Sequence, residues 1–373
     1  PNENCEMTDP GCCIRGKFAH GSLYALEHDG TFKWESQLWR MPEFVIENGG
    51  GPAIGDMNGD GWPEIAFGNA VFSHNGQLLF EGTTSTSADG GDGEGGAGHG
   101  PMSVFVDLNG DGTNELVSGR TAFNYAGEKI WHREDLADGL STVANVDADS
   151  NPEVILLTAS NDLLVLEDDG TTLYGPLHIS SGQLNEDGED EGFIATNPAV
   201  GDLDGDGYPE IVISATNWVY VFEHDLTLKW KAQSSDQTGA SGPTTFDFEG
   251  DGRAEVVYAD EGNVFIWDGV DGHLKYQAAR GSRTIFDNPV IVDVDNNGHA
   301  DILLAMESPL GDVGMHGVIA YSNDKENWVG TRRVWNQHSY HISNISESGI
   351  VPAFEGAGWI EHNVYRSNVV RCE

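Results

Sequence analysis

Basic side chains are scarce in this sequence. Its 373 residues include 18 lysines and arginines against 61 aspartates and glutamates, which gives a formal net charge of −43 at pH 7. A surface of this charge repels the phosphate backbone of nucleic acids and the anionic headgroups of membranes, so neither is expected as a partner. The chain also lacks a continuous apolar run of 18 residues, so we expect no segment that spans a bilayer.

Cysteine is also rare and lies only near the two ends of the chain, at Cys5, Cys12, Cys13 and Cys372. This placement predicts disulfides formed in an oxidising compartment, and a metal cluster is disfavoured because no Cys-x-x-Cys pair is present. We expect one of the three N-terminal cysteines to bond Cys372, and the sequence leaves open which one. Because the chain begins at Pro1 rather than Met and shows no leader, it is interpreted as the processed form of a secreted protein.

What the sequence does contain is one acidic loop in six copies, whose first residues lie between 38 and 57 residues apart. Each copy has an acid or amide at positions 1, 3 and 5, usually a glycine at position 6, and an acid at position 9. Self-similarity at such a spacing is typical of a repeat architecture. The residues at positions 1, 3, 5, 7 and 9 are Asp56, Asn58, Asp60, Trp62 and Glu64; Asp107, Asn109, Asp111, Thr113 and Glu115; Asn145, Asp147, Asp149, Asn151 and Glu153; Asp202, Asp204, Asp206, Tyr208 and Glu210; Asp247, Glu249, Asp251, Arg253 and Glu255; and Asp293, Asp295, Asn297, His299 and Asp301.

The pattern predicts six calcium sites, one in each loop. Calcium takes about six to eight oxygen ligands. Side chains at positions 1, 3 and 5 converge as the loop curls, position 7 offers its backbone carbonyl whatever its side chain, and the acid at position 9 completes the shell. An EF-hand is excluded because position 12 is never acidic and because Pro63, Pro152 and Pro209 oppose a helix after the loop. Solvated Asp-Gly turns are the alternative, but such turns do not require an acid at position 9 in every copy.

A second repeat follows each loop and consists of an alternating strand, a turn and an aromatic residue four positions after the turn. The turn residues and aromatics are Gly30 and Trp34, Gly76 and Phe80, Gly127 and Trp131, Gly170 and Tyr174, Leu226 and Trp230, and Gly272 and Tyr276, with a less regular copy from Asp324 to Trp328. Seven hairpins at this spacing predict an all-β fold, a seven-bladed β-propeller with four-stranded blades over residues 21–352. An open or eight-bladed arrangement is the alternative.

The first hairpin has no acidic loop before it, and its partner is expected at the other end of the chain. Residues 344–352 keep the loop spacing and Gly349 but lack the carboxylates, so we interpret them as a seventh, metal-free copy. Its strand is expected to pair with the N-terminal hairpin and close the ring, which removes exposed sheet edges. Residues 1–20 then form a cysteine-containing N-terminal segment, and residues 353–373 form a closing segment tied by Cys372.

The stretch from Asn197 to Ile213, Asn-Pro-Ala-Val-Gly-Asp-Leu-Asp-Gly-Asp-Gly-Tyr-Pro-Glu-Ile-Val-Ile, resembles the FG-GAP repeat of integrin-alpha-type and VCBS-like proteins. The resemblance covers roughly residues 20–352, although the literal Phe-Gly signature survives at a single place. It implies a calcium-binding propeller and adhesion-type roles, with ligands usually bound on the face opposite the calcium loops. Two long acidic linkers, residues 83–100 and 178–196, are expected on that face.

These features favour a non-catalytic, calcium-stabilised extracellular module that binds a protein or glycan ligand or associates with itself, with about six Ca²⁺ ions as its cofactors. The first alternative is a calcium-dependent polysaccharide lyase, which needs a base and a cation beside the uronate. Its candidate residues are Arg280, Arg283, Arg332, Arg333, His338 and His341, of which the two histidines lie in a segment more typical of a packed or hydrogen-bonded strand. The second alternative is a lectin, for which Trp218, Trp267 and Trp359 are candidate stacking platforms.

Overall fold

The computed structural model describes residues 19–37, 39–41, 50–82, 101–147, 149–180, 196–282, 287–306, 317–323, 325 and 327–371. Almost all regular structure in these ranges is β-strand, and the one helix among them is the short α2 (Gly358–Glu361). No helix in this part of the chain is long and apolar enough to cross a membrane.

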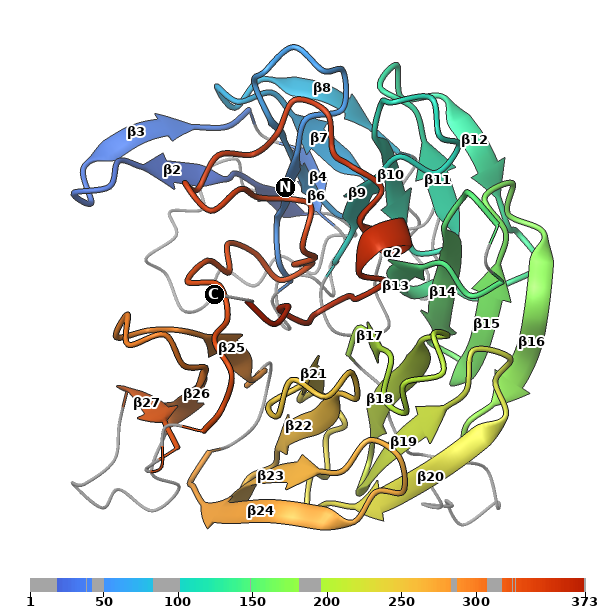
Figure 1. Cartoon of the computed structure of the whole chain (residues 1–373). Helices are drawn as coiled ribbons and strands as arrows, with labels where there is room; N and C mark the ends of the chain where they lie inside the picture. The colour runs from blue at the N-terminus through green and yellow to red at the C-terminus, as the bar shows by residue number, and fades with distance from the viewer. Residues whose placement is uncertain are drawn as a thin grey trace, which may run out of the picture.

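The strands form antiparallel sheets that follow one another around a ring (Figure 1). Five of the sheets have four strands each, hydrogen-bonded in chain order. They are β5–β8 (Ala53–Gly55, Glu64–Phe67, Ala70–Phe72 and Leu78–Glu81), β9–β12 (Val104–Val106, Glu115–Ser118, Thr121–Phe123 and Lys129–His132), β13–β16 (Gly139–Ala144, Glu153–Thr158, Asp162–Leu166 and Thr172–His178), β17–β20 (Ala199–Gly201, Glu210–Ala215, Trp218–Phe222 and Leu228–Gln233) and β21–β24 (Thr244–Phe246, Glu255–Ala259, Asn263–Trp267 and Leu274–Ala279).

Two smaller sheets take the remaining places in the ring (Figure 1). They are the three-stranded β25–β27 (Val290–Val292, Asp301–Met306 and Gly317–Tyr321) and the hairpin β2–β3 (Tyr24–Leu26 and Phe32–Glu35). Strands β1 (Ala19–Gly21) and β4 (Trp39–Met41) pair with each other. The all-β, seven-bladed propeller predicted from the hairpin count is confirmed.

Burial falls from the centre of the ring outward, as the β21–β24 blade illustrates. Strands β21 and β22 are completely buried, whereas β24 is mostly exposed. The inner strands have a neighbouring blade on each face, so their sequences are continuous apolar runs. The outermost strand carries polar residues such as Lys275 and Gln277. The core is therefore divided into layers between successive blades.

The aromatic residue of four hairpins, Trp34, Phe80, Trp131 and Trp230, packs against the turn glycine of the next blade. A Cβ atom placed on Gly170 would lie 2.7 Å from Trp131, and one on Gly272 would lie 2.7 Å from Trp230. The indole Nε1 of Trp131 also donates a hydrogen bond to the carbonyl of Asp168 in that next turn, at 2.9 Å. The glycine-aromatic repeat of the sequence is thus a contact between blades as well as a hairpin signature.

The C-terminal segment crosses the middle of the ring and binds the inner strands of three blades (Figure 1). Tyr365 exchanges two backbone hydrogen bonds with Val200 of β17, at 3.0 and 3.1 Å. Ser367 Oγ donates to a carbonyl of β21 at 2.6 Å, and Asn368 Nδ2 donates to the carbonyl of Ile291 in β25 at 3.0 Å. This segment therefore links β17, β21 and β25 across the axis.

The expected pairing between residues 344–352 and the N-terminal hairpin is not formed. Residues 344–352 contain turns and no strand, and among the described strands β2 and β3 pair only with each other. The guanidinium of Arg332 donates to the carbonyls of Ile342 and Ile345, at 2.7 and 2.5 Å, which holds this part of the chain in turns. The four cysteines and the linker at residues 83–100 lie outside the described residues, as does most of the second linker, residues 181–195.

We predict that Gly272→Ala destabilises the protein more than Gly30→Ala. Both glycines occupy the same turn position with a positive φ (73° and 82°), so each substitution has the cost of a left-handed alanine, about 1–2 kcal/mol. Only Gly272 faces a tryptophan of the preceding blade, which adds roughly 1–3 kcal/mol of overpacking, whereas nothing lies within 4 Å of a Cβ on Gly30. Denaturant unfolding measures both, and equal losses would contradict the contact between blades.

Candidate metal centre

The six acidic loops lie on one face of the propeller. Each connects the first and second strands of a blade, and the strands of a blade run antiparallel in chain order, so the turn between the third and fourth strands lies on this same face. The turns between second and third strands and the connections between blades lie on the opposite face. Residues of the loops can therefore meet residues of the third-to-fourth turns.

Within a loop, side chains accept hydrogen bonds from the backbone of the residues that follow them. In the loop of the β17–β20 blade, Asp202 accepts from the amides of Gly205 and Gly207, at 2.7 and 3.0 Å. Asp204 accepts from the amide of Asp206 at 3.1 Å. Both glycines have a positive φ (81° and 91°), which lets the chain curl around these carboxylates.

The acid at position 9 makes the same hydrogen bond in all six loops. One of its carboxylate oxygens accepts from the backbone amide at position 2, at 2.6 to 3.0 Å. The pairs are Met57 and Glu64, Leu108 and Glu115, Val146 and Glu153, Leu203 and Glu210, Phe248 and Glu255, and Val294 and Asp301. All six acids are buried. A carboxyl group is thus buried at the start of the second strand in each of these six blades.

Burial raises the pKa of these position-9 glutamates. The pKa of Glu64 rises to about 7 and that of Glu153 to about 8, mainly because burial disfavours the charged form, with neighbouring aspartates adding to the shift. A hydrogen bond from the position-2 amide opposes the shift in both cases. Each of the five loops that end in a glutamate therefore favours either a proton or a cation beside its buried acid.

Several carboxylates come close enough to share a metal ion, and some of them were not predicted. Asp202, Asp204 and Asp206 each offer an oxygen within 4.8 Å of the others, as the loop pattern predicts. The structure adds acids from the third-to-fourth turns, in the clusters Asp204, Glu210 and Glu223; Asp147, Glu153 and Glu167; and Asp268, Asp271 and His273. In each of these three blades an acid directly follows the third strand, namely Glu223, Glu167 or Asp268. The nine-residue loop pattern does not include that position.

Two loops depart from the common hydrogen-bond pattern. In the β13–β16 blade, position 1 is an amide, and Asn145 Nδ2 donates to the carbonyl of Asp149 at 2.8 Å. In the β21–β24 blade, the longer side chain of Glu249 at position 3 reaches Lys275 Nζ at 2.8 Å. The side chains at position 7 vary as expected, and Trp62, which is 59% exposed, stacks on His74 with ring centroids 4.6 Å apart.

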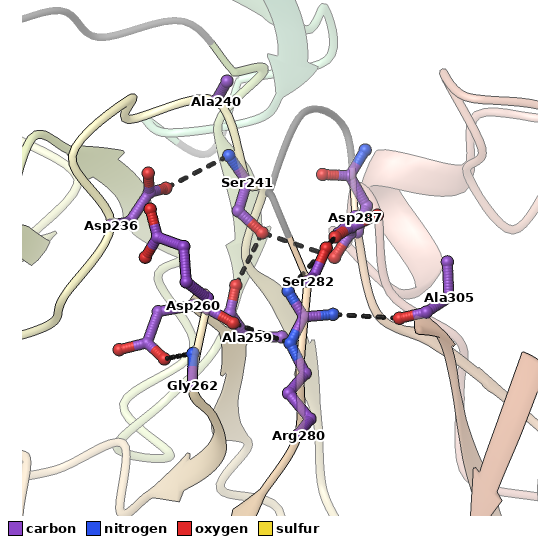
Figure 2. A network of polar contacts seen from close by, with 12 residues as sticks. Asp236, Ala240, Ser241, Ala259, Asp260, Gly262, Arg280, Ser282, Asp287 and Ala305 are labelled. Atoms are coloured by element: carbon purple, nitrogen blue, oxygen red, sulfur yellow. Dashed lines mark hydrogen bonds and ion pairs between the residues drawn. The ribbon is translucent and has the colours of Figure 1, made fainter. Parts of the chain in front are cut away.

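The opposite face carries a buried polar network between the last blades (Figure 2). Arg280 donates from Nε to the carbonyl of Asp260 at 2.7 Å and from a terminal nitrogen to the carbonyl of Ala305 at 3.1 Å. Its other terminal nitrogen lies 3.3 Å from Asp287. Asp236 accepts from the buried hydroxyl of Tyr258 at 2.7 Å. Figure 2 shows the guanidinium of Arg280 directed at the carbonyl of Ala305, so this contact joins the β21–β24 and β25–β27 blades.

The candidate lyase residues do not form an open site. His338 is partly buried with its Nε2 3.1 Å from Arg366, and desolvation followed by that arginine's charge lowers the pKa of His338. His341 is paired with Glu355, and Arg280 and Arg332 bond backbone carbonyls. The segment from residue 335 to residue 341 is packed and hydrogen-bonded, although it forms turns instead of the expected strand. Arg283 lies outside the described residues.

The tryptophans proposed as sugar platforms are covered by other residues. Trp267 and Trp359 are buried. The ring of Trp218 is half-buried, and Lys231 Nζ lies 4.3 Å from its centroid. None of the three offers an open aromatic face.

Comparisons with known proteins agree with the repeat and the fold. A model of the FG-GAP-like repeat matches residues 202–258 and 247–304. The structure of the biofilm matrix protein Bap1 of V. cholerae is similar over 94% of this chain and 81% of that chain, at 19% identity and a TM-score of 0.72. The exotype rhamnogalacturonan lyase YesX is similar over 83% of this chain and 64% of that chain, at 16% identity and a TM-score of 0.44. A search of curated protein sequences gives no match.

The likeness to Bap1 concerns the fold alone, since only 19% of the residues are identical. The likeness to the lyase is weaker and says nothing about activity here. The two repeat matches together cover three successive acidic loops, which begin at Asp202, Asp247 and Asp293, and the strands between them. Residues 202–304 therefore contain FG-GAP-like repeats, within a chain that has the fold of a β-propeller.

Proposed function

We propose that this protein is a non-catalytic, calcium-stabilised module that acts outside the cell in adhesion or self-assembly. The observation that carries this proposal is repeated in six loops: the backbone curls around the oxygen-bearing side chains of positions 1, 3 and 5, beside a buried acid at position 9. Calcium prefers such all-oxygen sites. The loops would hold about six ions through the side chains at positions 1, 3, 5 and 9 and the carbonyl at position 7.

The residues present fit a bound cation. Glu153 is fully buried, its Oε2 accepts from the amide of Val146, and its Oε1 has no hydrogen-bond partner. A buried carboxylate oxygen without a partner is costly unless a proton or cation satisfies it. Calcium would supply that charge and fix the loop, and the chain's own backbone amides already orient the carboxylates.

The extracellular setting is supported by three observations. Loops of modest affinity suit the high calcium concentration outside cells. A formal charge of −43 is offset in part when divalent ions bind. The structurally similar Bap1 is a biofilm matrix protein. We propose that a protein or glycan ligand, or a second copy of the chain, binds on the face opposite the loops, with residues 83–100 and 178–196 as contributors.

Removing calcium should lower the melting temperature by more than about 10 °C. A site at a calcium concentration 100-fold above its Kd adds about 2.7 kcal/mol, and several such sites act together. Thermal unfolding after chelation and after calcium is restored measures the change, with magnesium as the control ion. An unchanged melting temperature would contradict the metal assignment.

The calcium effect should grow as the pH rises from 5 to 8. Without metal, the position-9 glutamates have folded pKa values of about 7 to 8, above their ordinary value of 4.5. Their protonation stabilises the metal-free fold at low pH, and this contribution is lost as the pH rises through the folded pKa values. Calcium binds the ionised form and releases protons.

This pH dependence is measured by thermal unfolding of metal-free and calcium-loaded protein at both pH values. A Glu64→Gln variant serves as the control, because its loop cannot titrate at this position and should contribute less to the difference. A calcium-induced shift that is equal at pH 5 and pH 8 would argue against the buried acids as ligands.

The proposed assembly role predicts calcium-dependent self-association or ligand binding without turnover. Sedimentation of the purified protein with and without calcium measures its size, and a glycan array in calcium tests for sugar ligands. Turnover of a polyuronate, lost in His338→Ala, would overturn the non-catalytic proposal.

A further inference from the structure

A lysine ammonium group fills a second cation position beside the acidic loop of the β17–β20 blade. Lys229 Nζ lies 2.5 Å from Asp204, 2.9 Å from Glu223 and 3.3 Å from Glu210 Oε1. Asp204 and Glu210 are positions 3 and 9 of the loop, and Glu223 begins the turn after β19. The lysine comes from β20, and only 10% of its side chain is exposed. We call this place the strand-side position. It lies between the acids at positions 3 and 9 of the loop and the two outer strands of the blade.

The β21–β24 blade fills its strand-side position in the same way. Lys275 Nζ lies 2.8 Å from Glu249 and 2.7 Å from Glu255, which are again positions 3 and 9 of the loop. Lys229 and Lys275 occupy equivalent places in their strands, because each directly precedes the aromatic residue of its hairpin. Two blades thus carry their own counter-ion for the buried acid.

The β13–β16 blade has the acids of this position without the lysine. Asp147, Glu153 and Glu167 correspond to Asp204, Glu210 and Glu223 and offer oxygen atoms within 4.8 Å of one another. The residue that directly precedes the hairpin aromatic is Leu173. The two outer strands are paired in the same way around this residue in both blades. Tyr174 is paired with Val165, as Trp230 is paired with Val221.

The buried acid of this cluster has no counter-ion in the described part of the chain, and its free oxygen is available both to the loop ion and to an ion at this position. Glu153 is completely buried, and its Oε1 makes no hydrogen bond, whereas the equivalent oxygen of Glu210 faces Lys229. Among the residues that the structure describes, no lysine or arginine forms an ion pair with any of the three acids of this blade. Three carboxylates around one point repel one another when ionised, so they favour a cation from solution over the proton that would otherwise neutralise Glu153.

We propose that the β13–β16 blade binds an additional divalent cation of the calcium class at its strand-side position, held by Asp147, Glu153 and Glu167 in the place that Lys229 fills in the β17–β20 blade. An all-carboxylate donor set selects a hard cation over zinc or copper. The inference extends the proposed function, because two of its ligands are also loop positions. Glu167 occupies none of the nine loop positions, so a substitution of Glu167 affects the additional site and leaves the loop site intact.

Two substitutions test this site independently of the loops. Glu167→Gln removes the ligand that only the additional ion uses, and Leu173→Lys supplies the ammonium group that the β17–β20 and β21–β24 blades have. Native mass spectrometry in calcium counts the bound ions. Each variant is expected to bind one ion fewer than the wild type, and Leu173→Lys should also weaken the dependence of thermal stability on calcium.

The matched controls come from the β17–β20 blade. Glu223→Gln should leave the number of bound ions unchanged, because Lys229 already occupies that position, and Lys229→Leu should add one ion. If the wild type binds calcium but Glu167→Gln and Leu173→Lys bind the same number, the additional site is wrong and the loop sites stand. If the wild type binds no calcium, this inference and the proposed function both fail.

Discussion

The structure depends on one hydrogen bond that recurs in every acidic loop, from the backbone amide at position 2 to the buried acid at position 9. It ties the end of the innermost strand to the start of the second strand, as between Leu203 and Glu210. It also leaves a carboxylate inside the blade, where burial disfavours its charge. A proton, a lysine or a metal ion must compensate, so blade stability is linked to cation supply.

The blades are coupled to one another by contacts that do not involve the loops. Aromatic side chains such as Trp131 and Trp230 pack on the turn glycine of the next blade, and the C-terminal segment bonds to β17, β21 and β25 through the centre. A loop that rigidifies one blade therefore supports its neighbours. Through these contacts, the proposed metal sites on one face would stabilise the whole ring.

Local patterns in the sequence predicted the strands, the hairpins and positions 1 to 9 of the loops, because these features depend on residues close together in the chain. The roles of Glu167, Glu223 and Lys229 were not predicted, since their contacts with the loops depend on the register of two outer strands. The turns at residues 344–352 were missed for a similar reason: Arg332 bonds Ile342 and Ile345 there, and no repeat pattern encodes that contact.

The most direct test of the account is an anomalous-scattering map from crystals grown in calcium. It should show an ion in each of the six loops, about 2.3–2.6 Å from carboxylate oxygens that include the acid at position 9. Loops that hold only water in saturating calcium, with the buried acids still bonded to the position-2 amides, would contradict the central claim that a cation completes each blade.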